Sequence, residues 1–342
     1  MSITTHERPG VYSDYDASTV ISTSGGGQTA GLVAVCAGGE AGTLYVLNRY
    51  EEAVTAFGQE ENLTELVRLL LLNGAAQVRA VPVTEESGYD AAFNLLAAEE
   101  NVALVVCDST DVAVQQKLRD SVCSASEARR ERIAVVCGGT EEGVENLVQR
   151  AGQLNSERVV LVAPGDDGCL LAAAVAGAIA GESDAALPLS GAELKGVSQT
   201  QAQYSDSEID TLVRGGVTPL ERVGGVVSVV RGITTRTKTG EAPDATWREL
   251  TTIRIVDDVI PAIRNALRAK FQRSKNTEQT RGAIRSQVIL ELENKLKREI
   301  IAGYENVTVQ ADAENPTVCL VDFSFTVAHG LNQIWLSAHI TV

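Results

Sequence analysis

Short apolar runs alternate with segments of helical periodicity from Gly31 to about Ala163. Apolar runs bounded by polar or glycine residues predict buried strands. We expect such strands at 32–36, 77–83, 102–107, 133–137 and 159–162. The segments between them predict helices at 62–73, 88–99, 111–130 and 141–154. Strands that are apolar throughout, with helices between them, indicate a mostly parallel sheet with helices on both faces.

The small residues of 169–180 predict a further helix, packed closely on this sheet. The chain then becomes richer in Gly, Ser, Asp and Pro over 182–220, which indicates a boundary between domains. We therefore predict an α/β domain at 25–190 and a second domain at 191–330.

The second domain has an α+β pattern. Strands are expected at 226–231 and 250–256, followed by two helices. Pro261 is expected in the first turn of the first helix, where a missing backbone N–H does no harm. The apolar face of this helix would carry Ile260, Ile263, Leu267 and Phe271. The second helix would carry Ile284, Val288, Leu292, Leu296 and Ile300 at every fourth position.

Both chain ends have the pattern of extended segments. Apolar and polar residues alternate over 321–327 and again, after an expected turn at 329–332, over 334–342. The apolar positions of the last run are Ile334, Leu336, Ala338, Ile340 and Val342. Residues 2–24 show no helical periodicity, and Pro9 disfavours helix at the residue before it. A neighbouring molecule is one place for such segments to pair; the alternative is a frayed N-terminus and a C-terminal strand that closes its own sheet.

Composition places the chain among folded proteins. Its 342 residues suffice for two domains, with 44% apolar and 22% charged residues. The aromatic share of 4% is low, so Ala, Val and Leu must fill the cores. A net charge of −16 argues against general binding to nucleic acid or to anionic membranes, since both would repel the chain.

The sequence also indicates the compartment. Residues 1–7 lack the apolar core of a signal peptide, and the longest apolar stretch, 169–180, is shorter than the roughly 20 residues that span a bilayer. The cysteines form no CxxC pair and mostly lie in apolar runs, which predicts buried thiols in a reducing compartment. They are Cys36, Cys107, Cys123, Cys137, Cys169 and Cys319. We expect a soluble protein made in a cytoplasm.

The sequence patterns typical of enzymes do not occur. The chain has no GxxxxGK[ST], GxSxG or HExxH motif, and no GxGxxG after its first strand. The three histidines, His6, His329 and His339, lie in terminal segments that we interpret as structural. Asp257 and Asp258 precede Pro261, where acidic residues stabilise a helix N-terminus. We therefore expect no catalytic residue, no cofactor and no metal site.

One basic cluster stands out on this acidic chain. Between Arg264 and Arg285 there are seven Lys or Arg residues against a single Glu. The cluster can be interpreted as a solvated helix face or as a surface that binds an acidic partner. Nucleic acid is disfavoured, because Phe271 is the only aromatic residue in the cluster and belongs to the apolar face.

Taken in order, these segments resemble the tail sheath proteins of contractile phage tails and phage-tail-like bacteriocins. The resemblance rests on Arg8-Pro9-Gly10-Val11-Tyr12, the strand and Gly-rich turn at 31–42, Gly215-Gly216-Val217 before 226–232, Thr252–Asp258, and the alternating runs of 317–342. It covers essentially the whole chain. The order of the motifs carries it, and no single motif is highly specific.

The resemblance implies a structural role. A sheath subunit would have a variable α/β domain facing outward and a C-terminal domain against an inner tail tube, and it would need no cofactor. Subunits would form stacked hexameric rings linked by extended arms, here 1–24 and 331–342. The implied arm contacts are Pro9, Gly10, Val11, Tyr12, Val20, Ile334, Leu336, Ala338, Ile340 and Val342. The implied tube contacts are Arg264, Arg268, Lys270, Arg273 and Lys275.

The partners implied in this way are other copies of the chain, the tube protein, and the baseplate and tail terminator proteins. Nucleic acid and membrane insertion are not among them. Two alternatives stay open: a sheath component of a secretion or injection apparatus, and a cytosolic α/β enzyme. The enzyme reading explains the α/β half but lacks a convergent set of polar residues.

Overall fold

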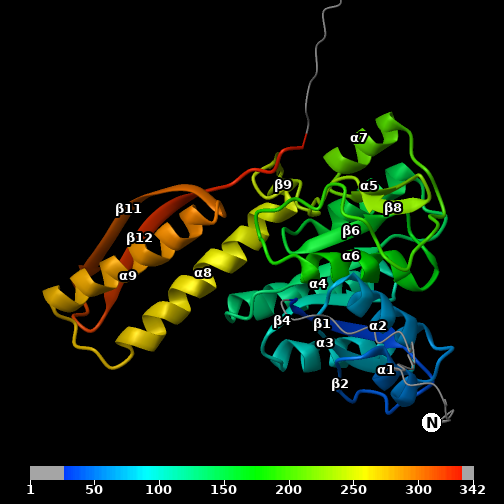
Figure 1. The fold of residues 1–342 in the computed structure, drawn as a ribbon, viewed down its shortest axis with the longest axis horizontal. Helices are drawn as coiled ribbons and strands as arrows, with labels where there is room; N and C mark the ends of the chain where they lie inside the picture. The colour runs from blue at the N-terminus through cyan, green and yellow to red at the C-terminus, as the bar shows by residue number, and fades with distance from the viewer. Residues whose placement is uncertain (1–26, 333–342) are drawn as a thin grey trace, which may run out of the picture.

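The computed structural model describes residues 27–332. This part of the chain contains an α/β unit built on an eight-stranded sheet, and a C-terminal unit of two long helices and a two-stranded sheet (Figure 1). The predicted fold class is therefore confirmed. The two predicted arms, apart from 331–332, lie outside the described residues.

The large sheet has the strand order β2-β3-β1-β4-β5-β6-β7-β8. The six central strands of the sheet, β3, β1, β4, β5, β6 and β7, run parallel. The edge strands β2 and β8 are antiparallel to their neighbours. The strands are β1 (Thr29–Val35), β2 (Tyr45–Leu47), β3 (Gln77–Val83), β4 (Val102–Cys107), β5 (Ile133–Cys137), β6 (Val159–Ala163), β7 (Thr218–Val223) and β8 (Val226–Val229). The predicted buried strands are thus confirmed, because their side chains are covered on both faces.

Helices cover both faces of this sheet. One face packs against α1, α2 and α6, and the other against α3, α4, α5 and α7. The helices are α1 (Tyr50–Phe57), α2 (Asn62–Asn73), α3 (Tyr89–Ala98), α4 (Val112–Glu127), α5 (Val144–Leu154), α6 (Leu170–Gly181) and α7 (Asp206–Arg214). Short 3-10 turns, η1 (Glu86–Gly88) and η2 (Asp167–Cys169), precede α3 and α6.

The small residues of α6 allow close packing, as the sequence predicted. A Cβ atom on Gly177 would lie 2.7 Å from both the Leu70 carbonyl oxygen and the Asn73 Cβ of α2. Only glycine therefore fits at this helix crossing. Every residue of α6 from Leu171 to Gly177 is buried.

The C-terminal unit consists of α8 (Leu250–Phe271), α9 (Glu278–Lys297), β11 (Ile301–Ala311) and β12 (Cys319–Val327). A short hairpin, β9 (Lys238–Thr239) and β10 (Ala242–Pro243), precedes it. In Figure 1, α8 leaves the α/β unit and runs outward beside α9, with β11 and β12 next to α9. Ile255, Val259 and Ile263 of α8 form a separate core with α9 and β11.

Three predictions about this region are wrong. Residues 250–256 are not a strand but the start of α8, and Pro261 lies in the middle of that helix instead of its first turn. Asp257 and Asp258 consequently lie inside the helix and not before it. The start of α8 is apolar on two sides, because Leu250 and Ile253 join the core of the sheet while Ile255 joins the core of the C-terminal unit. A helix that is buried on two sides has a continuous apolar run in its sequence, which cannot be distinguished from the run of a buried strand.

The sheet also extends beyond the limit of 190 that we predicted for the α/β domain. Strands β7 and β8 lie at 218–229, and β7 pairs in parallel with β6. The Gly- and Ser-rich segment before them is a long connection within this unit, and not a linker between units. Among the helices of residues 27–332, none is both long and apolar enough to cross a bilayer.

Candidate assembly surfaces

Among residues 27–332, no strand lies on either outer edge of the two-stranded sheet of β11 and β12, and we call this sheet open-edged. The strands pair antiparallel from Ile301 with Val327 to Ala311 with Cys319. No other strand among residues 27–332 joins this sheet. Backbone N–H and C=O groups along both outer edges therefore lack strand partners in the described part of the chain. An open edge of this kind accepts an added strand.

The faces of this sheet differ. Val321, Phe323, Phe325 and Val327 are half-buried and pack against the core of the C-terminal unit. Tyr304 of β11 donates a hydrogen bond from its hydroxyl to Glu293 of α9. The alternate residues of β12 are exposed: Leu320, Asp322, Ser324 and Thr326. The predicted alternation over 321–327 is confirmed, and α9 holds the sheet by one face only.

Strand β11, the partner of β12, was not predicted from the sequence. Two irregularities in register interrupt its pattern, between Ile301 and Gly303 and between Glu305 and Thr308. The only usable signal was the short alternation of Val307 and Val309 with Thr308 and Gln310.

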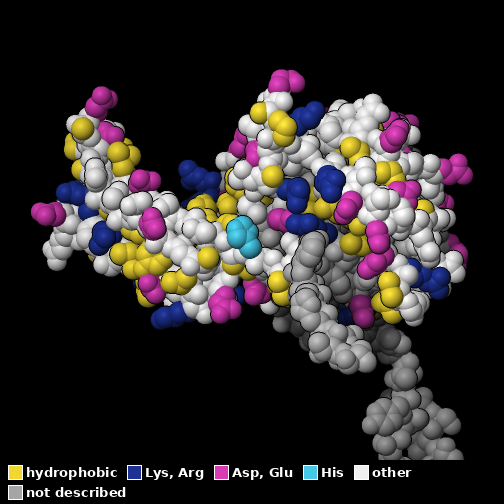
Figure 2. Space-filling view, turned by 90° about the horizontal axis from the view of Figure 1, so that it is seen from above, with side chains coloured by type: hydrophobic (Ala, Val, Ile, Leu, Met, Phe, Trp, Pro, Cys, Tyr) yellow, Lys and Arg dark blue, Asp and Glu magenta, His cyan; other side chains and the backbone are white. Residues whose placement is uncertain are grey.

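The five basic residues predicted to contact the tube lie near the end of α8 or just after it, and they divide into two groups. Arg264 pairs with Glu131 of the α/β unit, with Nη2 and Oε1 2.6 Å apart, and Lys270 donates a hydrogen bond to Gln287 of α9. Arg268, Arg273 and Lys275 are exposed, and none of them takes part in an ion pair among the described residues. Figure 2 shows the C-terminal unit as a lobe beside the larger α/β unit, with Lys and Arg side chains on its surface.

The linker between α8 and α9 is tied to the hairpin loop of β11 and β12. The Asn276 Nδ2 donates to the carbonyl oxygens of Pro316 and Val318, at 2.8 and 3.1 Å. Arg281 donates in turn to the Asn276 Oδ1 at 3.0 Å. The segment that carries Arg273 and Lys275 is therefore anchored at the tip of the C-terminal unit. No pattern in the sequence indicated this role for Asn276.

The predicted arm contacts lie outside the described residues. They are Pro9, Gly10, Val11, Tyr12 and Val20 of the N-terminal arm, and Ile334, Leu336, Ala338, Ile340 and Val342 of the C-terminal arm.

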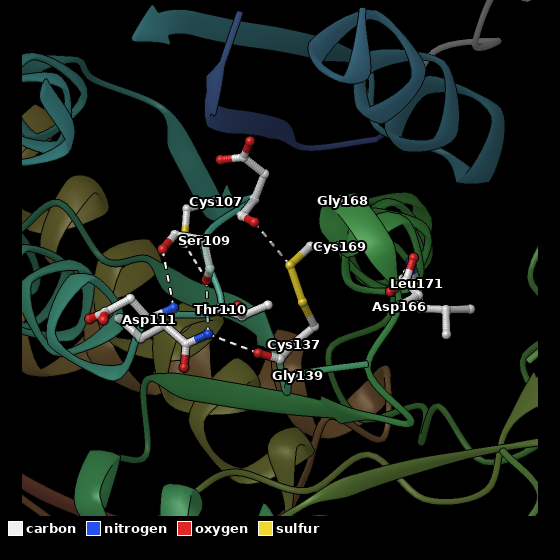
Figure 3. Close-up of a disulfide and its surroundings, with 12 residues drawn as sticks. Cys107, Ser109, Thr110, Asp111, Cys137, Gly139, Asp166, Gly168, Cys169 and Leu171 are labelled. Atoms are coloured by element: carbon white, nitrogen blue, oxygen red, sulfur yellow. Dashed lines mark hydrogen bonds between the residues drawn. A yellow bond between two sulfur atoms is a disulfide. The ribbon is translucent and has the colours of Figure 1, made fainter. Parts of the chain in front are cut away.

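The C-terminal edge of the parallel strands is where an α/β enzyme would carry its site. A disulfide joins Cys137 at the end of β5 to Cys169 before α6 (Figure 3). The prediction of six free thiols is wrong for this pair; spacing in the sequence could not reveal it, since 32 residues separate the two cysteines. Cys36, Cys107, Cys123 and Cys319 are free.

The other groups at this edge have structural partners. Burial raises the pKa of the Cys107 thiol to about 12 and that of Cys36 to about 11, which keeps both thiols protonated and poorly nucleophilic. The Asp108 carboxylate accepts hydrogen bonds from the Tyr89 hydroxyl and the Val35 backbone N–H. The Gln115 amide donates to the Cys137 carbonyl oxygen at 2.8 Å (Figure 3).

The adjacent carboxylates of Asp257 and Asp258 are likewise paired. Asp257 forms two hydrogen bonds with Arg158, at 2.8 and 3.0 Å, and Asp258 pairs with Lys295. Residues 27–332 contain no group of three or more His, Cys, Asp or Glu side chains arranged to hold a metal ion.

Family models match the two halves of this architecture. The model of the phage tail sheath protein central domain matches residues 85–235, and that of the phage tail sheath C-terminal domain matches residues 242–341. The chain belongs to the phage tail sheath protein family. The second match includes both strands of the open-edged sheet.

A sequence relative and several solved structures agree with this membership. The tail sheath protein of Bacillus phage SP01 is 27% identical over 261 residues, which are 72% of this chain and 44% of the relative. This sheath-family chain thus spans less than half of the relative's length. A chain of the anti-feeding prophage baseplate has a TM-score of 0.74 at 15% identity, covering 99% of this chain and 100% of that one.

Two further structures share the fold. The helical sheath of the anti-feeding prophage in its contracted state has a TM-score of 0.72 at 16% identity, covering 98% and 99% of the two chains. The sheath tail protein from Desulfitobacterium hafniense has a TM-score of 0.70 at 11% identity, covering 93% and 100%. At these identities the likeness concerns the fold of the sheath-family chain.

Proposed function

We propose that this chain is the structural subunit of a contractile tail sheath. Subunits would polymerise as stacked hexameric rings around an inner tail tube, and contraction would drive the tube through a target envelope. The observation that carries the proposal is the two-stranded sheet of β11 and β12, which α9 holds on one face and whose two edges have no strand partner within residues 27–332. A subunit of a polymer needs such edges, and a self-contained enzyme does not.

Residues 1–24 and 331–342 are the proposed occupants of these edges. Added from neighbouring subunits, the two segments would turn the pair of strands into a four-stranded sheet shared by three chains. Contacts of this kind are heterologous, and heterologous contacts generate rings and helical stacks. The related baseplate structure is six-fold symmetrised, which supports rings of six here.

The exposed basic residues Arg268, Arg273 and Lys275 are the proposed contact with the tube. Arg264 and Lys270 are engaged within the chain, so we assign them no direct share in that contact. The baseplate and tail terminator proteins are the further proposed partners. We propose neither a catalytic role nor a cofactor, and we place the protein in a phage tail or a similar particle assembled in a bacterial cytoplasm.

A second candidate is a sheath component of an injection apparatus. The observation that favours it is the fold similarity to the sheath and baseplate of the anti-feeding prophage over nearly the whole chain. The subunit mechanics are the same in both cases. The genes beside this one, for a capsid or for toxin cargo, would distinguish the two particles.

Single proline substitutions in the N-terminal arm test the proposal. Successive backbone N–H groups of a strand do not all face the same neighbour, so a ladder bond is lost in at least one of Val20→Pro and Ile21→Pro. Val20→Thr and Ile21→Thr are the matched controls, because threonine keeps the N–H and favours strands. Electron microscopy detects the polymers. We expect both threonine controls to form tubular polymers, and at least one of the two proline variants to form none. Normal polymers from both proline variants would exclude this arm as an added strand.

A further inference from the structure

Helix α8 presents a charged face to the α/β unit. Arg254, Asp257, Pro261, Arg264 and Arg268 recur every three or four residues, so they lie on one side of the helix. All five line one cleft of about 840 Å³, which also borders the N-terminal ends of β1, β4 and β5. Ile255, Val259 and Ile263 of α8 face the core of the C-terminal unit instead. On this side the two units therefore meet through charges across a cleft and not through apolar packing.

Two ion pairs cross this interface. Asp257 pairs with Arg158, which immediately precedes β6; these side chains are 16% and 13% exposed. Arg264 pairs with Glu131, which lies just before β5; these side chains are 32% and 16% exposed. The pair nearer the end of the helix is thus the more accessible to water and salt.

Pro261 lies between the two pairs. It has no backbone N–H to donate to the carbonyl oxygen of Asp257, so the helix loses a hydrogen bond at this point. A proline inside a helix is a common position of bending. The structure thus combines a weak point in α8 with one ion pair on each side of it.

The part of α8 before Pro261 is firmly anchored. Leu250 and Ile253 are buried in the core of the sheet. The Arg254 guanidinium donates to the carbonyl oxygens of Glu182, Asp184 and Leu187, at 2.9, 3.3 and 3.3 Å. Ala185 of the same loop packs in the core of the C-terminal unit. The contacts with the 182–187 loop therefore fix the start of α8, and the outer part of the helix can turn about this fixed end.

We propose that the ion pair of Arg264 and Glu131 is a releasable latch between the two units. Closed, it holds the outer half of α8, and with it α9 and the open-edged sheet, at a set angle to the α/β unit. Open, it lets the C-terminal unit tilt as one body, because Val259, Ile263 and the Asp258–Lys295 pair keep α8 and α9 together on both sides of Pro261. Asp257 and Arg158 still hold the inner end of α8 to the α/β unit. Polar interfaces between domains separate more readily than apolar ones. The latch is a property of the single chain and does not depend on the proposed sheath function.

Charge reversal in the dilute full-length chain tests the latch. The variants are Glu131→Arg, Arg264→Glu and the double exchange, with Arg268→Glu as the matched control on the same helix face. Small-angle scattering measures the radius of gyration, and amide exchange measures protection over 262–271. For each single reversal we expect a larger radius and exchange roughly threefold to tenfold faster. The double exchange should restore both values, and the control should leave both unchanged.

Two further measurements keep the test decisive. Circular dichroism and thermal melting establish that each variant is folded; Arg264→Gln, a milder change, replaces any reversal that is not. Raising the salt concentration from about 0.05 M to about 0.5 M should move the wild type toward the single reversals and leave the double-neutral Glu131→Gln, Arg264→Gln variant unchanged. The latch is refuted if a folded single variant keeps the wild-type radius and protection, or if the double exchange restores neither.

Discussion

Cys137 and Cys169 are covalently joined across the C-terminal edge of the parallel sheet, with their Cα atoms 5.7 Å apart. This spacing is within the usual range for a disulfide. The bond links the end of β5 to the turn before α6, the small-residue helix that packs against α2. It therefore closes a loop within the core of the α/β unit and plays no part in the open-edged sheet.

Removing this disulfide should destabilise the α/β unit. Closing a loop of this length restricts the unfolded chain, which corresponds to about 3–4 kcal/mol in the free energy of unfolding. We expect Cys137→Ser, Cys169→Ser to lose about this amount in denaturant titrations under oxidising conditions, and to match the wild type in reductant. Cys123→Ser, which removes a free thiol, is the control. Peptide mapping without reductant would contradict the bond if it found Cys137 and Cys169 as free thiols.

The free energy of unfolding should depend on pH through the titration of Asp166. Burial raises the pKa of this carboxyl to about 6, against hydrogen bonds from the start of α6 that favour the charged form. The folded state thus holds a proton that the unfolded state has released between about pH 4 and 6, so this group lowers stability as pH rises through that window. Above it, the penalty stays constant.

Asp166→Asn measures this effect, because asparagine does not titrate. We expect the free energy of unfolding of Asp166→Asn, relative to wild type, to rise by about 1–3 kcal/mol between pH 4 and pH 7. Equal differences from wild type at pH 4 and pH 7 would show that Asp166 has an ordinary pKa.

Two glycines in helices should respond oppositely to alanine. At Gly177 a Cβ atom would press into α2, so we expect Gly177→Ala to cost about 1–3 kcal/mol. At Gly282 in α9 nothing lies within 4 Å of the added atom, and the better helix propensity of alanine should add about 0.5–1 kcal/mol. Thermal melting of both variants checks this. If Gly177→Ala melted at the wild-type temperature or higher, the close contact of α6 and α2 would be in doubt.

Burial on two faces decided how far the sequence predicted the fold. Strands such as 102–107 and 133–137 are uniformly apolar because helices cover them on both sides, and such runs between helical segments have one simple interpretation. The prediction for the start of α8 was wrong for the same reason, since a helix that contributes to two cores is apolar on two sides. Contacts between residues far apart in the sequence were not predicted either. Neither the register of β11 nor the Cys137–Cys169 bond leaves a local pattern in the sequence.

The candidate site was predicted only in part. The basic character of 264–275 is evident in the sequence, but which charges are available depends on contacts with distant residues. Glu131 lies 133 positions before Arg264, and Gln287 lies on the next helix beside Lys270. No periodicity within α8 distinguishes these two engaged residues from Arg268, which is exposed. The proposed tube contact therefore keeps three of the five predicted residues, Arg268, Arg273 and Lys275.

Reversing these three charges should separate tube binding from folding. Arg268→Glu, Arg273→Glu, Lys275→Glu changes exposed side chains that make no ion pair within residues 27–332, so we expect an unchanged thermal melting curve. Pair energies of ~0.2–1 kcal/mol at exposed sites are small singly but add up over many subunits of a polymer. Extended sheath around tube should therefore be lost, while subunits still pair with each other and form empty or contracted sheath.

The matched control reverses three exposed cations of the α/β unit, Lys117, Lys195 and Arg222, and gives the same change in net charge. Electron microscopy of sheath co-expressed with its tube protein counts extended, contracted and empty particles for each variant. Higher salt should weaken tube attachment of the wild type, because exposed pairs are screened within about 10 Å at 0.1 M. If the triple variant loads extended sheath as well as the control does, the end of α8 is not the tube contact, and the open-edged sheet must be tested separately.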